Sequence, residues 1–477
     1  MGYRVGEGRT QAGLFPVMLD ELVDAHAVVR VIEAWVEALD LAELGFERAQ
    51  PAPTGRPPYH PGDLLKLYLY GYLSGVRSSR RLERECQRNV ELMWMLGRLA
   101  PDHKTIAEFR RRQLAGLVAT AAAFVQFARV QRLVVGDTVA IDGSKLRAVA
   151  SRKAISGLRG LAEQDQVLRA RIEQYLAELD RADLAEAEAL PDRAAVQESL
   201  RVLRQRQGQV REQLEGLEQA KRSTQVRTEP DARPMKSLHG AAGYNLQAAV
   251  DAASHLIVHH EVVNEASDQQ QLAPMASAAA AALQRPALEV LADAGYSNAE
   301  QLAQLQAAGM QVVLPPVRSA NNQGDGTLYS RAAFAYDEAC DSYRCPAGEL
   351  LQRRNRSLRD KLFLYAPDKG VCGRCANKSR CTNSDRRWVS RSFFEAALQA
   401  TERRLEQRPD AMLRRRQTVE HPFGTIKEHI LGNARLLMRG MQGARAELSL
   451  AVLAYNIKRA ISLKGVAWIT AAVSAGA

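Results

Sequence analysis

Three acidic side chains stand at positions where they could bind metal ions beside a phosphate chain. Asp142 ends the apolar run VAID and is followed by Gly-Ser, and Asp293 ends LEVLAD and is followed by Ala-Gly. An acid at the end of a buried strand lies at the edge of a sheet, where α/β proteins build their sites. The small residues after each acid would let a phosphate backbone approach closely. Each aspartate taken alone could equally begin a turn.

The third acid, Glu420, is the only carboxylate in the stretch RRRQTVEHPFGTIK, whose four Arg and Lys side chains are fixed cations. On a helix, Arg416 lies four residues before Glu420 and Lys427 seven after it, so the three share one face. Pro422 is awkward inside a helix, so we expect the helix to begin or kink there. The stretch is typical either of a solvated helix face with a salt bridge or of a metal ligand beside a polyanion.

Together the three carboxylates have the chemistry to hold two Mg²⁺ or Mn²⁺ ions. Mg²⁺ prefers oxygen ligands and commonly takes one or two carboxylates together with phosphate and water. Two metal ions about 3.5–4 Å apart activate an attacking oxygen and stabilise a leaving one in phosphoryl transfer. The basic neighbours of Glu420 would then bind the phosphates of the strand that reacts.

Four cysteines predict a structural zinc site. Cys372 and Cys375 form a CxxC pair, with Cys381 six residues later. Cys345 lies upstream in RCPAG. Four thiolates in a loop-rich stretch could close a tetrahedral Zn²⁺ site, and such a site could fold a region too polar to build its own core. The alternative is reduced cysteine without a metal, and Cys340 is left over in either case.

The composition favours a basic globular protein that binds an anionic polymer. The 477 residues carry 65 Lys and Arg against 54 Asp and Glu, a formal net charge of +11. From position 401 onward, 13 Lys and Arg face 6 Asp and Glu, so most of the excess is C-terminal. Concentrated positive charge favours nucleic acid over membrane as partner. Because no apolar run reaches the roughly 18 residues of a membrane span and no signal region is visible, we expect a cytoplasmic protein.

Residues 1–115 are expected to form an all-α DNA-binding domain. An apolar helix is predicted at 60–75, and a short basic helix follows in SSRRLERECQRN, with Arg80 and Arg81 as candidate DNA contacts. A capping box that starts at Thr105 opens another helix, TIAEFRRRQL. Helices in short succession with one basic segment suit a helix-turn-helix module, whereas the alternative is a plain helical bundle with solvated arginines.

An α/β core is predicted in three pieces with two insertions between them. The core pieces are 134–157, 224–318 and 391–464, and the insertions are a helical hairpin at 158–223 and a cysteine-rich stretch at 319–390. Strands that alternate with helices indicate an α/β sheet. The core strands are predicted at 134–146, 243–251, 255–263, 288–291 and 310–314, and the helices at 268–283 and 297–308.

The predicted hairpin is a coiled coil with no visible chemistry. Apolar residues follow alternating steps of four and three, with one polar interruption, which is a heptad seam. Pro191 splits the stretch, so two antiparallel helices are expected, for packing or self-association. The seam consists of Val196, Leu200, Leu203, Gln207, Val210, Leu214 and Leu217.

Taken in order, these motifs resemble a bacterial insertion-sequence transposase of the DDE class, which has an RNase H-like core. AIDGS and ADAGY are followed by a late R-x-x-x-E-x-x-x-x-x-x-K, and Leu413 stands where the late motif of the wider group has Tyr. HPGDLLKLYLYGYLSGVRSSRRLE and PDHKTIAEFRR are similar to the family's helical DNA-binding region. GYNLQAAVD and EASDQQQLAPM are similar to its second strand and the start of its first core helix. The cysteine-rich insert before the glutamate helix resembles one subgroup.

The resemblance implies that Asp142, Asp293 and Glu420 form a triad for two Mg²⁺ or Mn²⁺ ions. It implies hydrolysis at the ends of the insertion sequence, which frees a 3′-hydroxyl that attacks target DNA. Arg416 and Lys427 would contact end DNA, the terminal inverted repeat, near the scissile phosphate. Because two ends must be brought together, the resemblance also implies at least a homodimer, in a nucleoid-associated protein.

Two other functions stay open at the level of sequence. A metal-dependent nuclease would use the same acids to cut DNA without joining it, and only the products separate it from a transposase because one metal pair serves both reactions. A DNA-binding architectural protein could assemble through the hairpin. The three placed acids argue against the architectural alternative, because binding alone does not need them.

Overall fold

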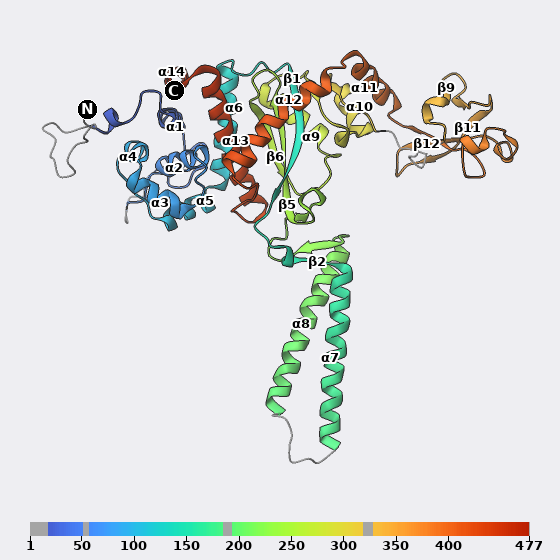
Figure 1. Ribbon diagram of the computed structural model, residues 1–477, viewed down its shortest axis with the longest axis horizontal. Coiled ribbons are helices and arrows are strands. Elements are labelled where there is room, and N and C mark those ends of the chain that lie inside the picture. The colour runs from blue at the N-terminus through green and yellow to red at the C-terminus, as the bar shows by residue number, and fades with distance from the viewer. Residues whose placement is uncertain (1–17, 51–56, 185–192, 318–327, 477) are drawn as a thin grey trace, which may run out of the picture.

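The computed structural model describes residues 18–50, 57–184, 193–317 and 328–476. A six-stranded mixed sheet lies at the centre of this part of the chain (Figure 1). Strand β1 pairs antiparallel with β5 and parallel with β7, β7 pairs in parallel with β8, and β4 and β6 both pair with β5. The strands are β1 Thr138–Arg147, β4 Arg233–Pro234, β5 Ala242–Asp251, β6 Ile257–Val263, β7 Glu289–Leu291 and β8 Gln311–Val313.

Burial explains why these segments form strands. All ten residues of β5 are buried, and β1 begins with four buried residues. Strands that are covered on both faces read as near-continuous apolar runs. The predicted strands of the core are found, and the mixed sheet agrees with the RNase H-like α/β core that the resemblance implies, antiparallel on one side of β1 and parallel on the other.

Helices cover both faces of the central sheet (Figure 1). Val139 and Ile141 of β1 share one hydrophobic cluster with α9, α10 and α11, whereas Ala140 points to the opposite face and shares a cluster with α12 and α13. Helix α9 begins four residues later than predicted, so Asp268 precedes it. These helices are α9 Leu272–Leu283, α10 Ala299–Ala307, α11 Glu395–Gln407, α12 Ala411–Gly424 and α13 Gly440–Lys464.

The N-terminal region is helical, as predicted, and it packs directly on the core. Helix α13 contacts α2 and α6, and α14 contacts α1, so these helices share one hydrophobic cluster with the sheet. A buried ion pair from Arg77 Nη1 to Glu447 Oε1, 2.8 Å long, also joins the two parts. The helices are α1 Val28–Glu37, α2 Pro61–Leu73, α3 Ser79–Arg88, α4 Val90–Met95, α5 His103–Arg112, α6 Leu114–Val130 and α14 Val466–Gly476.

The predicted capping box at Thr105 is wrong, because α5 begins two residues earlier, at His103. Asp102 is the cap: its Oδ1 accepts hydrogen bonds from the backbone N–H groups of Lys104 and Thr105, at 2.8 and 3.0 Å. The Thr105 hydroxyl donates to the other carboxylate oxygen at 2.8 Å. An N-cap aspartate satisfies backbone donors that the first turn leaves free, so the threonine supports the cap and does not form it.

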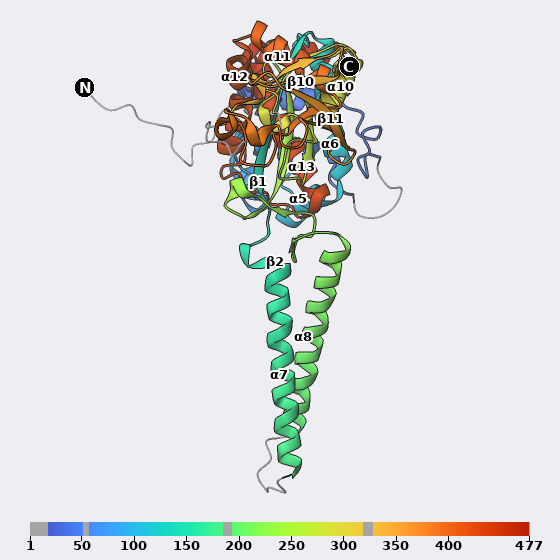
Figure 2. The ribbon, with the colours of Figure 1, turned by 90° about the vertical axis from the view of Figure 1, so that its right-hand side faces the viewer.

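The helical hairpin projects from the core as an antiparallel pair (Figures 1 and 2). Strands β2 and β3 pair at its base, and the predicted Pro191 break lies outside the described residues. Its apolar seam includes Leu161, Leu168, Val210 and Leu217, with Leu158, Leu203 and Leu214 packed against them. The elements are β2 Ile155–Gly157, α7 Leu158–Leu184, α8 Arg193–Gln219 and β3 Thr224–Val226.

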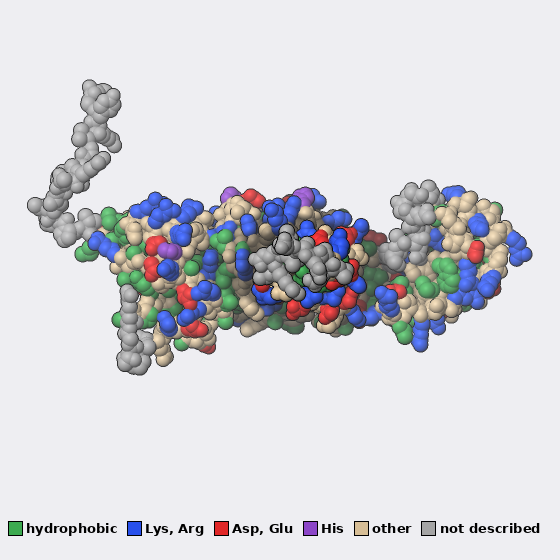
Figure 3. Space-filling view, turned by 90° about the horizontal axis from the view of Figure 1, so that it is seen from below, with side chains coloured by type: hydrophobic (Ala, Val, Ile, Leu, Met, Phe, Trp, Pro, Cys, Tyr) green, Lys and Arg blue, Asp and Glu red, His purple; other side chains and the backbone are tan. Residues whose placement is uncertain are grey.

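The cysteine-rich stretch forms an antiparallel sheet of its own, with strand order β13-β12-β11-β10-β9. The expectation of a loop-rich region too polar for a core is therefore wrong, since buried side chains gather on one side, namely Phe334, Tyr343, Leu351, Tyr365 and Val389. Lys and Arg side chains gather over this part, at the right of Figure 3. The strands are β9 Ala335–Asp337, β10 Ser342–Arg344, β11 Leu350–Ser357, β12 Leu362–Ala366 and β13 Val389–Ser392.

No single helix in the described ranges is long and apolar enough to cross a membrane. The pair α5 and α6, bent by 73° where the two helices meet, meets the length and composition of a span only when both are taken together.

Candidate active site

The register of the sheet sets Asp142 beside Asp293. Strands β1 and β7 run parallel, and Ala140 pairs with Leu291. Two residues further along each segment stand Asp142, within β1, and Asp293, which is separated from the end of β7 by Ala292. Side chains two apart on a strand point to the same face, so both carboxylates leave the sheet at the same edge, as the sequence predicts.

A single cation, Arg415 of α12, bridges the two aspartates. Its Nη2 lies 2.8 Å from Asp142 Oδ1 and 3.5 Å from Asp293 Oδ2. The Arg415 side chain is only 14% exposed, yet its Nε has no hydrogen-bond partner in the described chain. The pKa of Asp142 is raised, chiefly by burial and further by the charges of Asp293 and Asp268, against the opposing effect of Arg415. The carboxylates therefore converge on a position that calls for positive charge.

A network of polar side chains lies behind Asp142. Asp268 accepts hydrogen bonds from Lys145 Nζ at 2.6 and 2.8 Å, from Asn245 Nδ2 at 2.7 Å and from Gln247 Nε2 at 2.6 Å. Tyr296 donates its hydroxyl proton to Gln247 Oε1. The side chains of this network thus restrain one another. We call these five residues the polar bed.

Gly143 is required by the polar bed. A Cβ at this position would lie 2.6 Å from Asp268 Oδ1 and would also collide with Gln247 Nε2. Sequence reasoning missed Lys145, Asp268 and Gln247 as parts of the site. The available signal was Gln247 itself, a polar residue in the otherwise apolar run LQAAV, which needs a buried partner.

Glu420 stands apart from the aspartates in this structure. Its side chain is 71% exposed, and in the described chain it pairs with Arg416 at 3.8 Å and with neither aspartate. Arg415 and Glu420 are five residues apart, which turns them about 140° from each other around a helix. The prediction that Arg416 lies on the side of Glu420 is confirmed. Sequence reasoning missed Arg415, the arginine that reaches the aspartates.

The helix does not begin at Pro422, so that part of the expectation is wrong. Helix α12 begins at Ala411, includes Pro422 and continues to Gly424. A π-helical segment, η8 Thr425–Ile430, follows directly. Half-buried Lys427 lies in this segment, and burial lowers its pKa while the charge of Asp142 opposes that effect. Lys427 therefore lies within electrostatic reach of Asp142. Single π-helical turns are rare and occur frequently at functional sites.

Two family models match the chain. One is described as a transposase domain (DUF772) and matches residues 17–112, and the other is a transposase DDE domain and matches 223–457. Together they cover well over half of the sequence. The chain belongs to the DDE transposase family. The second match includes Asp293 and Glu420 but begins after Asp142.

Other comparisons add little to this assignment. No curated protein matches the chain. Among solved structures, it is similar to the chain described as a piggyBac transposase synaptic complex with hairpin DNA, with 7% identity and a TM-score of 0.26. That alignment covers 94% of this chain and 85% of the other. At this TM-score the likeness supports no conclusion about this transposase.

The transposase exposes Arg80 and Arg81 on α3 of the N-terminal region. Leu82 and Cys86 of the same helix are buried, whereas both arginines face solvent. The helix is therefore amphipathic, with its basic face free for an anionic partner. The two arginines lie within the matched transposase domain.

The four cysteines predicted as zinc ligands line one small cavity. All are free thiols, and exposed Cys340 is not part of the lining. The backbone N–H of Arg387 donates to Cys372 Sγ at 3.5 Å. Burial raises the pKa of Cys381, and the other three thiols add to this effect. In the ranges that the structure describes, however, no group of three or more His, Cys, Asp or Glu side chains is arranged to hold a metal ion.

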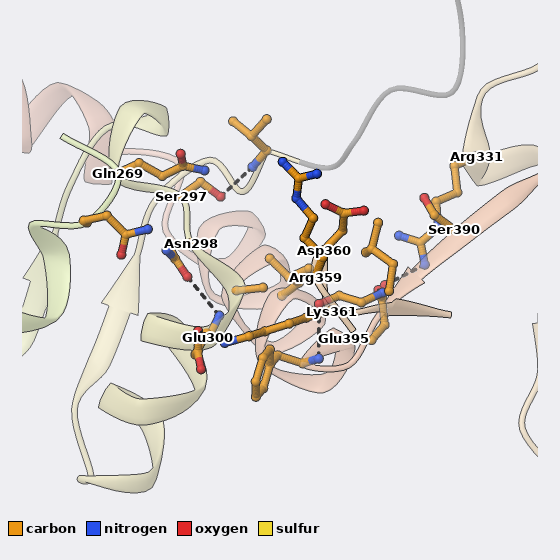
Figure 4. A pocket seen from close by; sticks show the side chains of 17 residues that line it. Gln269, Ser297, Asn298, Glu300, Arg331, Arg359, Asp360, Lys361, Ser390 and Glu395 are labelled. Carbon is orange, nitrogen blue, oxygen red and sulfur yellow. Dashed lines mark hydrogen bonds and ion pairs between the residues drawn. The ribbon is translucent and has the colours of Figure 1, made fainter. Parts of the chain in front are cut away.

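A cavity of about 620 Å³ separates the core from the cysteine-rich sheet (Figure 4). Its charges are largely balanced, because Lys361 pairs with Glu300, and Arg331 pairs with Glu395 at 2.7 Å. None of the three predicted catalytic acids lines it.

Proposed function

We propose that this transposase cuts DNA at the ends of its insertion sequence and transfers the freed 3′-hydroxyl into target DNA. In this proposal Asp142, Asp293 and Glu420 hold two Mg²⁺ or Mn²⁺ ions. The observation that carries the proposal is the parallel register of β1 and β7, which aims two carboxylates at one cationic position.

The aspartate pair fits a divalent metal ion. Membership of the DDE family implies dependence on divalent metal, and Arg415 stands where a cation would sit between Asp142 and Asp293. Its orphaned Nε makes the guanidinium a poorly satisfied occupant. When bound, the ions would activate the attacking oxygen and stabilise the leaving oxygen.

The side chains around the aspartates have separate tasks in this proposal. The polar bed holds the strand that carries Asp142, because Asp268 ties Lys145 of β1 to Asn245 and Gln247 of β5. Arg416 and Lys427 neutralise phosphates of end DNA, which accept charge-assisted hydrogen bonds from such groups. Arg80 and Arg81 add contacts to the DNA backbone away from the cut, where phosphate contacts fix the register of protein on DNA.

Glu420 joins the aspartates only if Arg415 leaves them. Both side chains belong to α12, so a rotation of this helix exchanges one for the other. The π-helical segment that follows α12 supports this idea, because such a segment holds an extra residue that can be moved along a helix. Glu420 is exposed, and among the described residues its ion pair is with Arg416, so no buried contact holds its side chain away from the aspartates.

The parts of the chain outside the core have proposed roles as well. The four cysteines that line one cavity would bind structural Zn²⁺, which takes four ligands in a tetrahedron and is commonly bound by thiolates. The hairpin would help two copies associate when two DNA ends are paired, and apolar side chains on its outer faces support this role. These side chains are Val167, Leu176 and Val202, which are 59%, 36% and 48% exposed.

A strand-transfer assay tests the proposed reaction. The purified protein is incubated with end DNA, a target plasmid and Mg²⁺ or Mn²⁺, and wild type is compared with Glu420→Gln and, as a matched exposed acid on the next turns, with Glu428→Gln. We expect joined products from wild type and Glu428→Gln but not from Glu420→Gln. Cutting without joining by wild type would favour a nuclease, and binding without either reaction would favour an architectural protein.

A further inference from the structure

A cationic pocket lies between α12, with its π-helical continuation, and α13. Its volume is about 220 Å³. One wall is formed by residues spaced four apart along α12 and η8. The other wall is formed by residues spaced three and four apart on α13, so each wall is one face of a helix. The lining consists of His421, Thr425 and His429 on the first wall and Tyr455, Lys458, Arg459 and Ser462 on the second.

The charges of this pocket are not compensated. The lining contains two fixed cations, Lys458 and Arg459, two histidines and no carboxylate. Neither Lys458 nor Arg459 forms an ion pair with a described acid, and Arg459 Nε donates to the neutral carbonyl of Ser254 at 2.7 Å. A pocket with unopposed cations attracts anions.

The walls of the pocket are held in place by part-buried hydrogen bonds. The Tyr455 hydroxyl donates to the carbonyl of His255 at 2.8 Å, and Nδ1 of His421 lies 3.2 Å from the same hydroxyl. Because that hydroxyl proton is already used, the His421 Nδ1–H donates to the Tyr455 oxygen. The ring of His421 is thereby oriented before any ligand binds, which lowers the cost of binding.

We propose that this pocket binds one backbone phosphate of the DNA on which the transposase acts. Ammonium, guanidinium and hydroxyl groups are the usual partners of DNA phosphates, and Thr425 and Ser462 supply the hydroxyls here. His421 directly follows Glu420, so a strand held in the pocket passes beside the proposed metal site. The proposal that the bound phosphate lies near the metal site rests on the proposed function. The proposal that the ligand is a phosphate rests on the pocket alone.

The first experiment measures the salt dependence of DNA binding by the full-length protein. Lys458→Gln is compared with Lys464→Gln, an exposed lysine six residues later on the same helix that does not line the pocket. Loss of one phosphate contact lowers the slope of log affinity against log salt by about one, equally on end DNA and on a scrambled duplex. We expect this for Lys458→Gln, with affinity about tenfold weaker, and wild-type values for Lys464→Gln. Equal slopes in all three proteins would overturn the proposal.

The second experiment identifies the source of the phosphate. Diethyl pyrocarbonate modification of His421 and His429 is mapped by mass spectrometry without ligand, with inorganic phosphate, and with a DNA duplex. We expect protection of both histidines by DNA at concentrations where inorganic phosphate gives none. Equal protection by inorganic phosphate would assign the pocket to a free anion and overturn the DNA assignment, as would no protection by either.

The two proposals fail in distinguishable ways. Glu420→Gln leaves the pocket intact, so histidine protection in that variant must equal wild type. If Glu420→Gln still cuts and joins DNA while Lys458→Gln shows the expected lower salt slope, the proposed triad is wrong and the pocket stands. If Glu420→Gln is inactive and Lys458→Gln keeps the wild-type slope, the triad stands and the pocket is wrong.

Discussion

Asp142 and Asp293 lie on two strands whose parallel register sets them side by side, whereas Glu420 lies on a helix that presents Arg415 to them. In a sheet, backbone hydrogen bonds fix each residue, and a slip by one turns every side chain to the other face. A helix presents another side chain whenever it rotates about its axis. The strand-borne half of the proposed site is therefore preformed, while its helix-borne half would depend on which cation lies between the aspartates.

The largest effect is expected from the strand-borne half. Asp142→Asn should lower cutting and joining about 1000-fold or more, because it removes a ligand for ions that supply several kcal/mol of charge stabilisation. DNA binding should stay near wild type. Rates on end DNA are measured for this variant and for Asp137→Asn, an exposed acid that precedes the same strand. Wild-type rates from Asp142→Asn would show that the aspartate pair is not the site.

The preformed half can also be broken through its packing. Gly143→Ala places a Cβ 2.6 Å from Asp268 Oδ1, so the polar bed must shift, and overpacking of this kind costs about 1–3 kcal/mol. Gly160→Ala on α7 meets open space and should be neutral or slightly stabilising. Urea unfolding of both variants measures the difference. An unchanged stability for Gly143→Ala would mean that the bed is not rigid.

The comparison is sharpened at the helix-borne half by removing Arg415, the cation that lies between the two aspartates. Arg415→Gln takes away the group that competes for the aspartates, so Mn²⁺ should bind about tenfold more tightly, which corresponds to ~1.4 kcal/mol. Arg414→Gln, a neighbour with no contact to either aspartate, serves as the control. Calorimetric titration with Mn²⁺ gives both affinities. Weaker binding by Arg415→Gln would mean that the arginine organises the aspartates instead of occupying their site.

The smallest effect is a pH dependence of stability. The pKa of Asp142 is raised in the folded protein above its ordinary value of 3.8, chiefly by burial. Its contribution to stability is therefore fully present below pH 3.8 and is lost as pH rises through the raised pKa. Asp142→Asn lacks this titration. The free energy of unfolding of wild type minus that of the variant should fall across this window, and a flat or rising difference contradicts the shift.

The sequence was most informative where residues lie on buried strands. Apolar runs that end in an acid predicted β1 and β7 and both aspartates, because burial on two faces leaves a readable pattern. The sequence does not show in the same way that Arg415, and not Arg416, reaches the aspartates. Three consecutive arginines give α12 the same charge over most of a turn, so charge does not show which arginine faces the aspartates. Packing of Val419 and Phe423 sets the rotation of the helix. A single sequence does not reveal that rotation.

The cysteine-rich sheet was missed for a different physical reason. Strand β11, LLQRRNRS, buries only one residue fully and exposes six, so it lacks the alternation that predicts a strand. The polar bed was missed because Asp268 meets Lys145 across more than a hundred residues of sequence. Contacts between residues so far apart in the sequence are known only once the fold is known.

Iron-directed cleavage of the protein backbone tests the central claim most directly. Fe²⁺ replaces Mg²⁺ or Mn²⁺, ascorbate and peroxide generate radicals at the bound ion, and the cut sites are mapped by mass spectrometry in the presence of end DNA. The account predicts cuts beside Asp142, Asp293 and Glu420, with the Glu420 cut lost in Glu420→Gln. Cuts beside the two aspartates alone, unchanged in Glu420→Gln, would contradict it, because the helix would then never bring its acid to the metal.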